Sequence, residues 1–222
     1  GKYAFYNCSS LISITIPKSM TSIGDGAFIA CYCLFEVYNK SALRIVAGYY
    51  SNGYVAYYAR NVYTDKFGES KLHKIGDYVF YVDGDNIELL AYVGGETDIT
   101  LPTDYEGMHY IIADKAFDGL TSLTSMLEIP PFADSHAFGN VNKSIPIYVP
   151  IQSVEAYMSA DYWRDFSNII GLCTIKLIAE NGTVTGTGIY EENSDVTLTA
   201  TANEGYRFVN WSDGVEDSIR TI

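Results

Sequence analysis

Residues 4–14 read AFYNCSSLISI, and residues 27–37 read AFIACYCLFEV. The two stretches share one spacing of alanine, phenylalanine, cysteine, leucine and a β-branched residue, and each shared position returns after 23 residues. One such segment cannot bury its own apolar side chains, but equivalent segments stacked about 4.8 Å apart share a core. We therefore predict a solenoid in which these residues point inward, because equivalent side chains line one inner wall.

A third copy lies much later in the chain, over residues 116–126, AFDGLTSLTSM. Aligned on its Ala-Phe pair, this copy places Leu123 in the position of Leu11 and Met126 in that of Ile14. Periods of 20–29 residues are typical of leucine-rich solenoids, in which every turn supplies one short strand. Each buried leucine, isoleucine or phenylalanine contributes about 1.5–3 kcal/mol, so several turns are needed for a stable stack.

The strand of each turn is marked by alternation that ends in proline. SITIP over residues 13–17 and DITLP over residues 98–102 place their aliphatic residues on one side and threonine on the other. Proline cannot donate a ladder hydrogen bond, so it ends the strand. A poorer fourth copy over residues 137–150 also ends in proline, and Ser144 in its leucine position predicts a looser turn.

Between about residues 39 and 98 the repeat lapses. The apolar residues of 53–63, GYVAYYARNVY, fall on one helical face and predict an inserted helix. Residues 77–93 predict a β-hairpin, because two apolar runs flank the turn-forming residues 83–86, DGDN. A calcium loop would need a glutamate where the chain has Gly94, so these residues favour the hairpin turn.

The solenoid is expected to end in a capping helix over about residues 151–166. Ser153 can act as its N-cap, and Trp163 and Phe166 are positioned to close the open end of the stack. We therefore predict a first domain over residues 1–171.

A second, small all-β domain is expected over residues 172–222. Its short alternating strands are separated by Asn-Gly and Glu-Gly turns, and Asn181-Gly182 predicts a hairpin. The predicted class is α/β but mostly β: a right-handed leucine-rich-repeat solenoid with short helical turns, followed by this small domain. We expect the chain to begin inside a repeat at Gly1 and to stop within a truncated domain at Ile222.

Composition excludes several kinds of partner. The chain has 27 acidic and 14 basic residues, a net charge of −13, so nucleic acids and anionic membrane surfaces would be repelled. No apolar run approaches the length of a membrane span, and we expect no direct membrane insertion of this sequence. With 48% hydrophobic residues, the chain can bury a core.

The cysteines do not predict a metal site. Cys31 and Cys33 lack the two-residue spacer of a zinc knuckle, and no histidine lies near them in the sequence. Cys8 and Cys31 occupy the same repeat position, which favours small buried apolar residues. A disulfide between neighbouring turns remains an alternative.

No catalytic motif is present either. The three histidines, His73, His109 and His136, have no common spacing and lie near no serine or cysteine nucleophile motif. We therefore expect no catalytic residue, no cofactor and no enzymatic activity.

Clustered tyrosines are the candidate binding residues. Tyr49, Tyr50 and Tyr54 lie among glycine and asparagine in a predicted loop, and tyrosine is rigid and amphipathic, as recognition surfaces require. The alternative is that these rings pack the interruption onto the solenoid. Trp211 is expected to anchor the core of the small domain, with a sugar-stacking platform as the alternative.

Three elements of residues 4–28, namely Ala-Phe, Asn-Cys-x-x-Leu and Ile-Pro-x-Ser, resemble the BspA-type, or treponemal, leucine-rich repeat. Residues 182–214 are similar to divergent InlB B-repeats. These resemblances imply a secreted or cell-surface bacterial protein, of a kind described as adhesins and non-catalytic interaction modules.

The function that we expect is therefore protein–protein interaction at or outside the bacterial surface, with a host matrix protein or a surface protein as partner. Two alternatives are a structural spacer that displays other domains and a glycan-binding accessory module.

Overall fold

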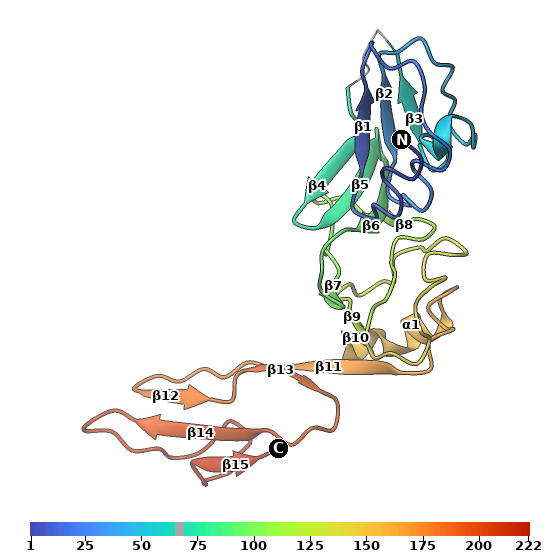
Figure 1. Cartoon of the computed structure of the whole chain (residues 1–222). Coiled ribbons are helices and arrows are strands. Elements are labelled where there is room, and N and C mark those ends of the chain that lie inside the picture. The colour runs from blue at the N-terminus through green and yellow to red at the C-terminus, as the bar shows by residue number, and fades with distance from the viewer. Residues whose placement is uncertain (65–68) are drawn as a thin grey trace. The chain divides into compact units, whose positions relative to one another are not determined.

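The structure is a computed structural model that describes residues 1–64 and 69–222. Its contacts define two compact units, each described by itself. Unit 1 comprises residues 1–96, 104–118 and 132–141, and unit 2 comprises residues 97–103, 119–131 and 142–222. Both are built mainly of short strands (Figure 1), which confirms the predicted repeat solenoid of mostly β class.

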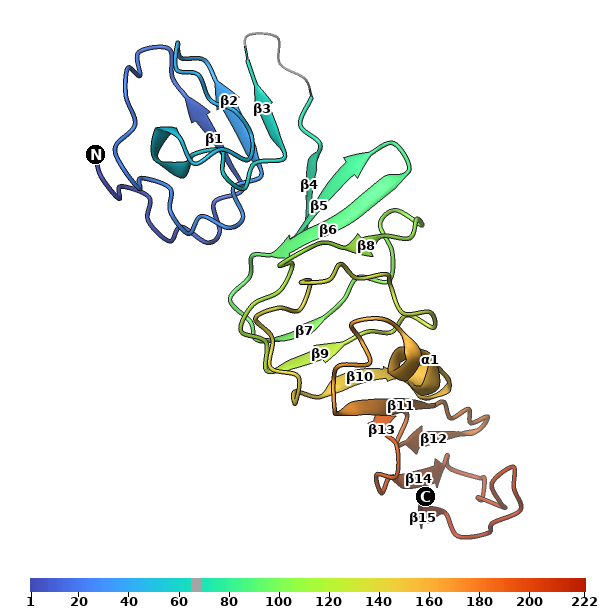
Figure 2. The ribbon, with the colours of Figure 1, turned by 90° about the vertical axis from the view of Figure 1, so that its right-hand side faces the viewer.

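Unit 1 begins with a parallel sheet in the order β1 (Ser13–Ile16), β2 (Glu36–Asn39) and β3 (Asn61–Tyr63) (Figure 2). The sheet register aligns one inward column, in which Ile14 lies opposite Val37 and Val37 opposite Val62. All three pack in the same hydrophobic core. The sequence period therefore becomes a column of stacked side chains, as predicted.

The phenylalanines of the repeat stack in the same way. The rings of Phe5 and Phe28 have centroids 4.9 Å apart and planes 7° apart. Phe117 and Phe138, from the two later copies, stack at 5.7 Å and 15°. The prediction that these residues fill equivalent positions is confirmed for each pair.

The predicted helix over residues 53–63 is wrong. Only one 3-10 turn forms, at Asn52–Tyr54, and residues 61–63 are strand β3. Backbone conformation explains the difference, because Gly53 has φ +65° and both of its neighbours also have positive φ. The inward apolar residues here follow the period of the solenoid turn, which sequence reasoning mistook for the period of a helix.

The predicted hairpin is confirmed as β5 (Tyr78–Asp83) and β6 (Asn86–Tyr92). Gly84, with φ +63°, occupies the first central position of the two-residue turn, where such turns favour glycine. Strand β4 (Leu72–Ile75) pairs antiparallel with β5, and β8 (Ile111–Ile112) pairs parallel with β6. The hairpin is thus joined to the parallel ladder through its second strand.

A buried carboxylate fastens the segment before this hairpin to the first sheet. Glu36 on β2 is fully buried and accepts hydrogen bonds from the hydroxyls of Tyr38, Tyr63 and Ser70 and from the backbone N–H of Lys71. These four donors satisfy a charge that would otherwise be costly to bury. Burial, followed by the bond to Glu36, raises the pKa of the Tyr63 phenol.

Unit 2 holds a second ladder, in the order β7 (Asp98–Thr100), β9 (Ser122–Thr124), β10 (Ile147–Pro150), β11 (Ile169–Ile175) and β13 (Gly188–Glu191). The first four strands are parallel, and β13 is antiparallel to β11. Gly171, the predicted domain boundary, lies within β11. The two-domain division at this residue stays a prediction.

One repeat alignment is wrong. In the ladder, Leu123 lies between Ile99 and Ile147, so it occupies the strand position that the sequence alignment gave to Met126. The third copy is therefore three residues shorter between its phenylalanine and its strand than the first copy. An alignment anchored on Ala-Phe could not detect this deletion.

The expected helix after Pro150 is shorter than predicted. A 3-10 turn at Ile151–Ser153 leads into α1 (Val154–Ser159), and β11 then extends the sheet. Trp163 is fully buried and Phe166 nearly so, as their predicted packing role requires. Ser153 precedes the helix, but its side chain makes no capping hydrogen bond.

The C-terminal part of unit 2 forms a small antiparallel sheet of β12 (Gly182–Thr185), β14 (Thr197–Ala202) and β15 (Ile219–Thr221). The hairpin predicted at Asn181-Gly182 is wrong, because β12 pairs with β14 and residues 176–180 form no strand. Asn181 does turn the chain, with φ +33°. The strand partner was set by long-range packing and not by the local turn.

All four cysteines are free thiols in the structure. Cys31 is fully buried in the core of unit 1, and Cys8 packs against that core, as predicted for small apolar residues. Within the part of the chain that the structure describes, no helix is long and apolar enough to cross a bilayer.

Candidate functional site

The loop that carries the predicted tyrosines is docked onto the second turn of unit 1. The backbone N–H of Phe28 donates to the carbonyl of Gly53 at 2.8 Å. Val55 and Ala56 are buried to 0% and 1% exposure and fill the core beneath the loop. Because these small apolar residues take the inward positions, the tyrosines beside them are left on the outer surface.

These tyrosines form a continuous aromatic surface, which we call the tyrosine ridge. Each ring contacts the next, with centroids between 4.8 and 6.3 Å apart, in the order Tyr50, Tyr54, Tyr57, Tyr58 and Tyr32. Tyr32 belongs to the preceding turn, so the ridge crosses two turns of the solenoid. The arrangement needs both the loop and the stacking of the turns.

The tyrosine ridge is accessible and uncharged. Tyr50 is 70% exposed, Tyr32 is 47% exposed and Tyr57 is 42% exposed. Burial, followed by the neighbouring phenols Tyr32 and Tyr57, raises the pKa of Tyr58, so this phenol stays neutral at physiological pH. The ammonium of Lys115 lies 5.9 Å from the ring centroid of Tyr58, within cation–π range.

The structure brings together two of the three predicted binding residues. Tyr50 and Tyr54 lie in the tyrosine ridge, whereas Tyr49 is exposed at 61% and joins none of the ring contacts found among the described residues. Sequence reasoning missed Tyr57 and Tyr58, because it placed them in a helix, and it missed Tyr32. The offset of 26 residues between Tyr32 and Tyr58 is close to the repeat period and was the available signal.

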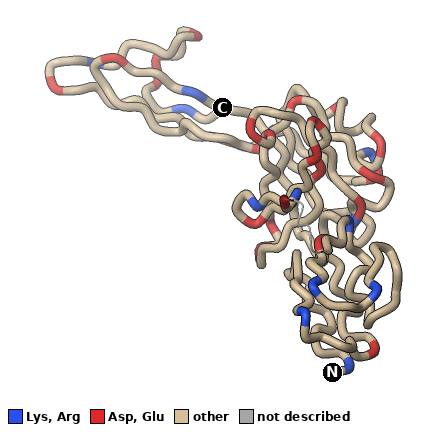
Figure 3. Tube along the Cα trace, turned by 90° about the horizontal axis from the view of Figure 1, so that it is seen from above, with Lys and Arg blue, Asp and Glu red and all other residues tan. Residues whose placement is uncertain are grey.

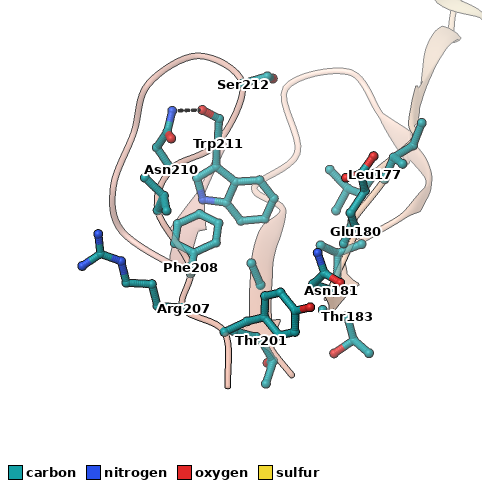
Figure 4. A pocket seen from close by; sticks show the side chains of 18 of the residues that line it. Leu177, Glu180, Asn181, Thr183, Thr201, Arg207, Phe208, Asn210, Trp211 and Ser212 are labelled. Carbon is teal, nitrogen blue, oxygen red and sulfur yellow. Dashed lines mark hydrogen bonds between the residues drawn. The ribbon is translucent and has the colours of Figure 1, made fainter. Parts of the chain in front are cut away.

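Unit 2 contains a pocket of about 560 Å³ beside its small sheet. Trp211 and Phe208 line one side of it and Leu177, Glu180 and Asn181 the other (Figure 4). Trp211 is half-buried, contacts Phe208 edge to face at 5.4 Å, and is therefore only a partial core anchor. The deeply buried core residues of this region are Val196 and Leu198.

One histidine lies beside a serine and an aspartate, but the geometry is not that of a catalytic triad. Ser135 Oγ lies 2.9 Å from Nδ1 of His136, and an Asp114 carboxylate oxygen lies 3.4 Å from that same nitrogen. A triad places the hydroxyl and the carboxylate on opposite ring nitrogens. His73 is engaged separately, with its Nδ1 2.8 Å from the Tyr105 hydroxyl oxygen.

Acidic side chains are spread along the trace of both units (Figure 3). Among the described residues, no group of three or more potential metal ligands comes together. Asp83 and Asn86, considered above for a calcium loop, are a cross-strand pair that flanks the hairpin turn, and Asp83 pairs with Lys71 at 2.6 Å.

Stacked parallel strands, columns of repeat side chains and an exposed aromatic ridge define a leucine-rich-repeat solenoid, a class that is typically non-catalytic and that generally mediates protein interactions. Residues 1–89 belong to the BspA type leucine rich repeat region family, whose model matches them in six copies. Residues 173–221 match the divergent InlB B-repeat domain. Both resemblances seen in the sequence are confirmed, and both families are typical of surface-associated bacterial proteins. A comparison with curated proteins finds no match for the chain.

Proposed function

We propose that this chain is a non-catalytic adhesion module of the bacterial surface or of the secreted fraction, and that the tyrosine ridge is its main contact with a protein partner. The observation that carries the proposal is the unbroken series of five tyrosine rings on a rigid repeat scaffold. The families matched at both ends of the chain support this class of function.

Tyrosine suits this role for physical reasons. Its ring presents a large apolar area with only two rotatable side-chain bonds, and its hydroxyl can accept or donate a hydrogen bond. Ring contacts within the ridge hold the side chains in place before binding, which lowers the entropy cost of association. Tyrosine is also among the residues enriched at the energetic centres of protein interfaces.

Charge favours a particular kind of protein partner. The chain has a net charge of −13, and the ridge itself contributes no negative charge. A partner with a basic surface around an apolar patch would be steered toward the chain and would meet the neutral rings at the centre of the contact. Extracellular matrix proteins with basic segments fit this description and are the partners that we propose.

The test is a binding screen with immobilised fibronectin, laminin, fibrinogen and collagen. The intact chain is compared with the double variant Tyr50→Ser/Tyr57→Ser and with the control Tyr6→Ser. Tyr6 is also an exposed tyrosine of unit 1, at 58%, but its ring contacts Tyr3 and not the ridge. Circular dichroism and thermal unfolding confirm that the variants remain folded.

We expect saturable binding to at least one of these proteins. The double variant should bind at least tenfold more weakly, because each tyrosine lost from an interface centre costs about 1–2 kcal/mol. The control should bind like the unmodified chain. No saturable binding to any matrix protein, or binding that the double variant retains in full, would contradict the proposal.

A further inference from the structure

The pocket in unit 2 is hollow because its floor is made of small side chains. Ala200 and Ala202 of β14 line it, and Val184 of β12 lies across from Ala200 in the sheet. Larger residues at the two alanines would fill the space between the flanking walls. A volume of about 560 Å³ falls within the range of small-molecule sites.

One wall offers an aromatic ring that is held in place. The indole N–H of Trp211 donates to the backbone carbonyl of Asp217 at 2.8 Å, and Phe208 packs edge to face against the same ring. With its only donor already engaged, the indole has its ring surface left for a ligand. The side chains of Trp211 and Phe208 lie toward the middle of the pocket (Figure 4).

The polar groups of the pocket lining have free hydrogen-bonding capacity. Across the described part of the chain, no hydrogen bond or ion pair engages the side chains of Glu180, Asn181 and Arg207. Together they supply a carboxylate acceptor, an amide that both donates and accepts, and a guanidinium donor. One negative and one positive charge among them leave no strong field of either sign.

From this combination we propose that the pocket binds a saccharide unit, with the ring of the sugar against Trp211 and its hydroxyls on Glu180, Asn181 and Arg207. A pyranose ring has an apolar C–H face, which fits an aromatic wall, and hydroxyls that donate and accept at once, which fit this mixed set of groups. The site is independent of the tyrosine ridge, which is built from other residues in unit 1.

Two other ligand classes fit the lining less well. An apolar side chain of a protein partner would cover the three polar groups without pairing them, and unpaired polar groups lose their hydrogen bonds to water. A phosphorylated ligand would meet the Glu180 carboxylate, which would repel it. A saccharide pairs the polar groups and covers the ring.

The experiment uses a glycan array of neutral and acidic oligosaccharides, followed by fluorescence titration of the intact chain with each array hit. The chain has two tryptophans, and Trp163 is fully buried, so a change in emission on binding reports on Trp211. Trp211→Ala removes the stacking ring, and Arg207→Gln removes the guanidinium from an exposed side chain.

Two further variants separate pocket filling from general damage to the sheet. Ala200→Leu fills the floor and leaves every ligand-binding side chain in place. Thr199→Leu is the matched control, because it adds a leucine to the same strand at a residue that does not line the pocket.

We expect at least one oligosaccharide to bind saturably and to change the tryptophan emission. Arg207→Gln should weaken it about tenfold, as loss of a charge-assisted hydrogen bond does. Trp211→Ala and Ala200→Leu should abolish binding, and Thr199→Leu should not change it. Absence of any saturable saccharide, binding that survives Ala200→Leu, or occupancy only by an apolar probe such as anilinonaphthalene sulfonate would overturn the proposal.

Discussion

Phe5 and Phe28 lie 23 residues apart in the chain, yet their rings are nearly parallel, with centroids 4.9 Å apart. The backbone shows the same relation, since the N–H of Phe5 donates to the carbonyl of Ala27, next to Phe28. Successive turns therefore place equivalent residues directly against one another. The column of apolar side chains holds the turns together and fixes the outward positions that carry the tyrosine ridge.

Replacement of Phe28 by alanine tests the energetic weight of this column. Phe28 is only 3% exposed, whereas Phe5 is 42% exposed. Phe28→Ala should lower the free energy of unfolding by about 3–5 kcal/mol, the usual cost of a buried phenylalanine, and Phe5→Ala by less than half as much. Urea unfolding measures both values. Equal losses for the two variants would show that the stack does not bury them as the structure indicates.

A second prediction concerns the glycine that anchors the tyrosine loop. Gly53 has φ +65°, and a Cβ added to it would lie 2.4 Å from the carbonyl oxygen of Gly24. Gly53→Ala should cost more than about 2 kcal/mol, because conformational strain and a backbone clash both oppose it.

Gly48 provides the matched control for this clash. It has φ +79°, but an added Cβ would meet nothing within 4 Å. Gly48→Ala should therefore cost only about 1–2 kcal/mol, from backbone strain alone. The comparison fails if thermal or urea unfolding finds the two variants equally destabilised.

Sequence alone was sufficient for the repeat, the hairpin and the inward columns, because each depends on local spacing. It failed at residues 53–63, where the inward spacing of Val55 and Ala59 is shared by a helical face and a solenoid turn. Choosing between them required the close contact of Gly53 with the preceding turn. That contact joins distant parts of the chain and leaves no local signal.

The candidate site was foreseen only in part for a related reason. Tyr50 and Tyr54 are near neighbours in sequence, and their grouping is visible there. Tyr32 joins them through the stacking of turns whose strands lie 23 residues apart between Ser13 and Glu36 but 25 apart between Glu36 and Asn61. Unequal turns make the alignment of surface residues depend on the fold.

Alkaline pH should weaken unit 2 through Tyr157. This residue is fully buried, and burial raises the pKa of its phenol from 10.0 to about 12. The folded state therefore holds the proton more tightly than the unfolded state. The resulting stabilisation, about 2–3 kcal/mol at most, is fully present below pH 10 and is lost as the pH rises through about 12.

Tyr157→Phe isolates this contribution. At neutral pH the variant should be less stable by about 1–2 kcal/mol, since the hydroxyl of Tyr157 donates to the Leu127 carbonyl at 3.1 Å. The advantage of the tyrosine should shrink as urea unfolding is repeated from pH 8 to about pH 11. A difference that stays constant over this range would mean that Tyr157 ionises equally in both states.

Ser153 offers a stabilising substitution. Its hydroxyl oxygen is buried and finds no hydrogen-bond partner in the described structure. Ser153→Ala removes the unsatisfied group and should raise the free energy of unfolding by about 1 kcal/mol. The exposed Ser159→Ala is the control at the other end of α1, and it should be neutral or slightly destabilising because its hydroxyl bonds to the Glu155 carbonyl. A loss of stability in Ser153→Ala would reveal a partner for the hydroxyl.

The central claim is that the repeat scaffold exists to present the tyrosine ridge to a protein. Hydroxyl-radical footprinting with mass spectrometry, applied to the chain alone and bound to the matrix protein it captures, measures this directly. The account predicts that Tyr32, Tyr50 and Tyr57 become protected in the complex while Tyr6 and Tyr206, exposed at 58% and 59%, keep their reactivity. Protection of the latter two with an unchanged ridge would contradict it.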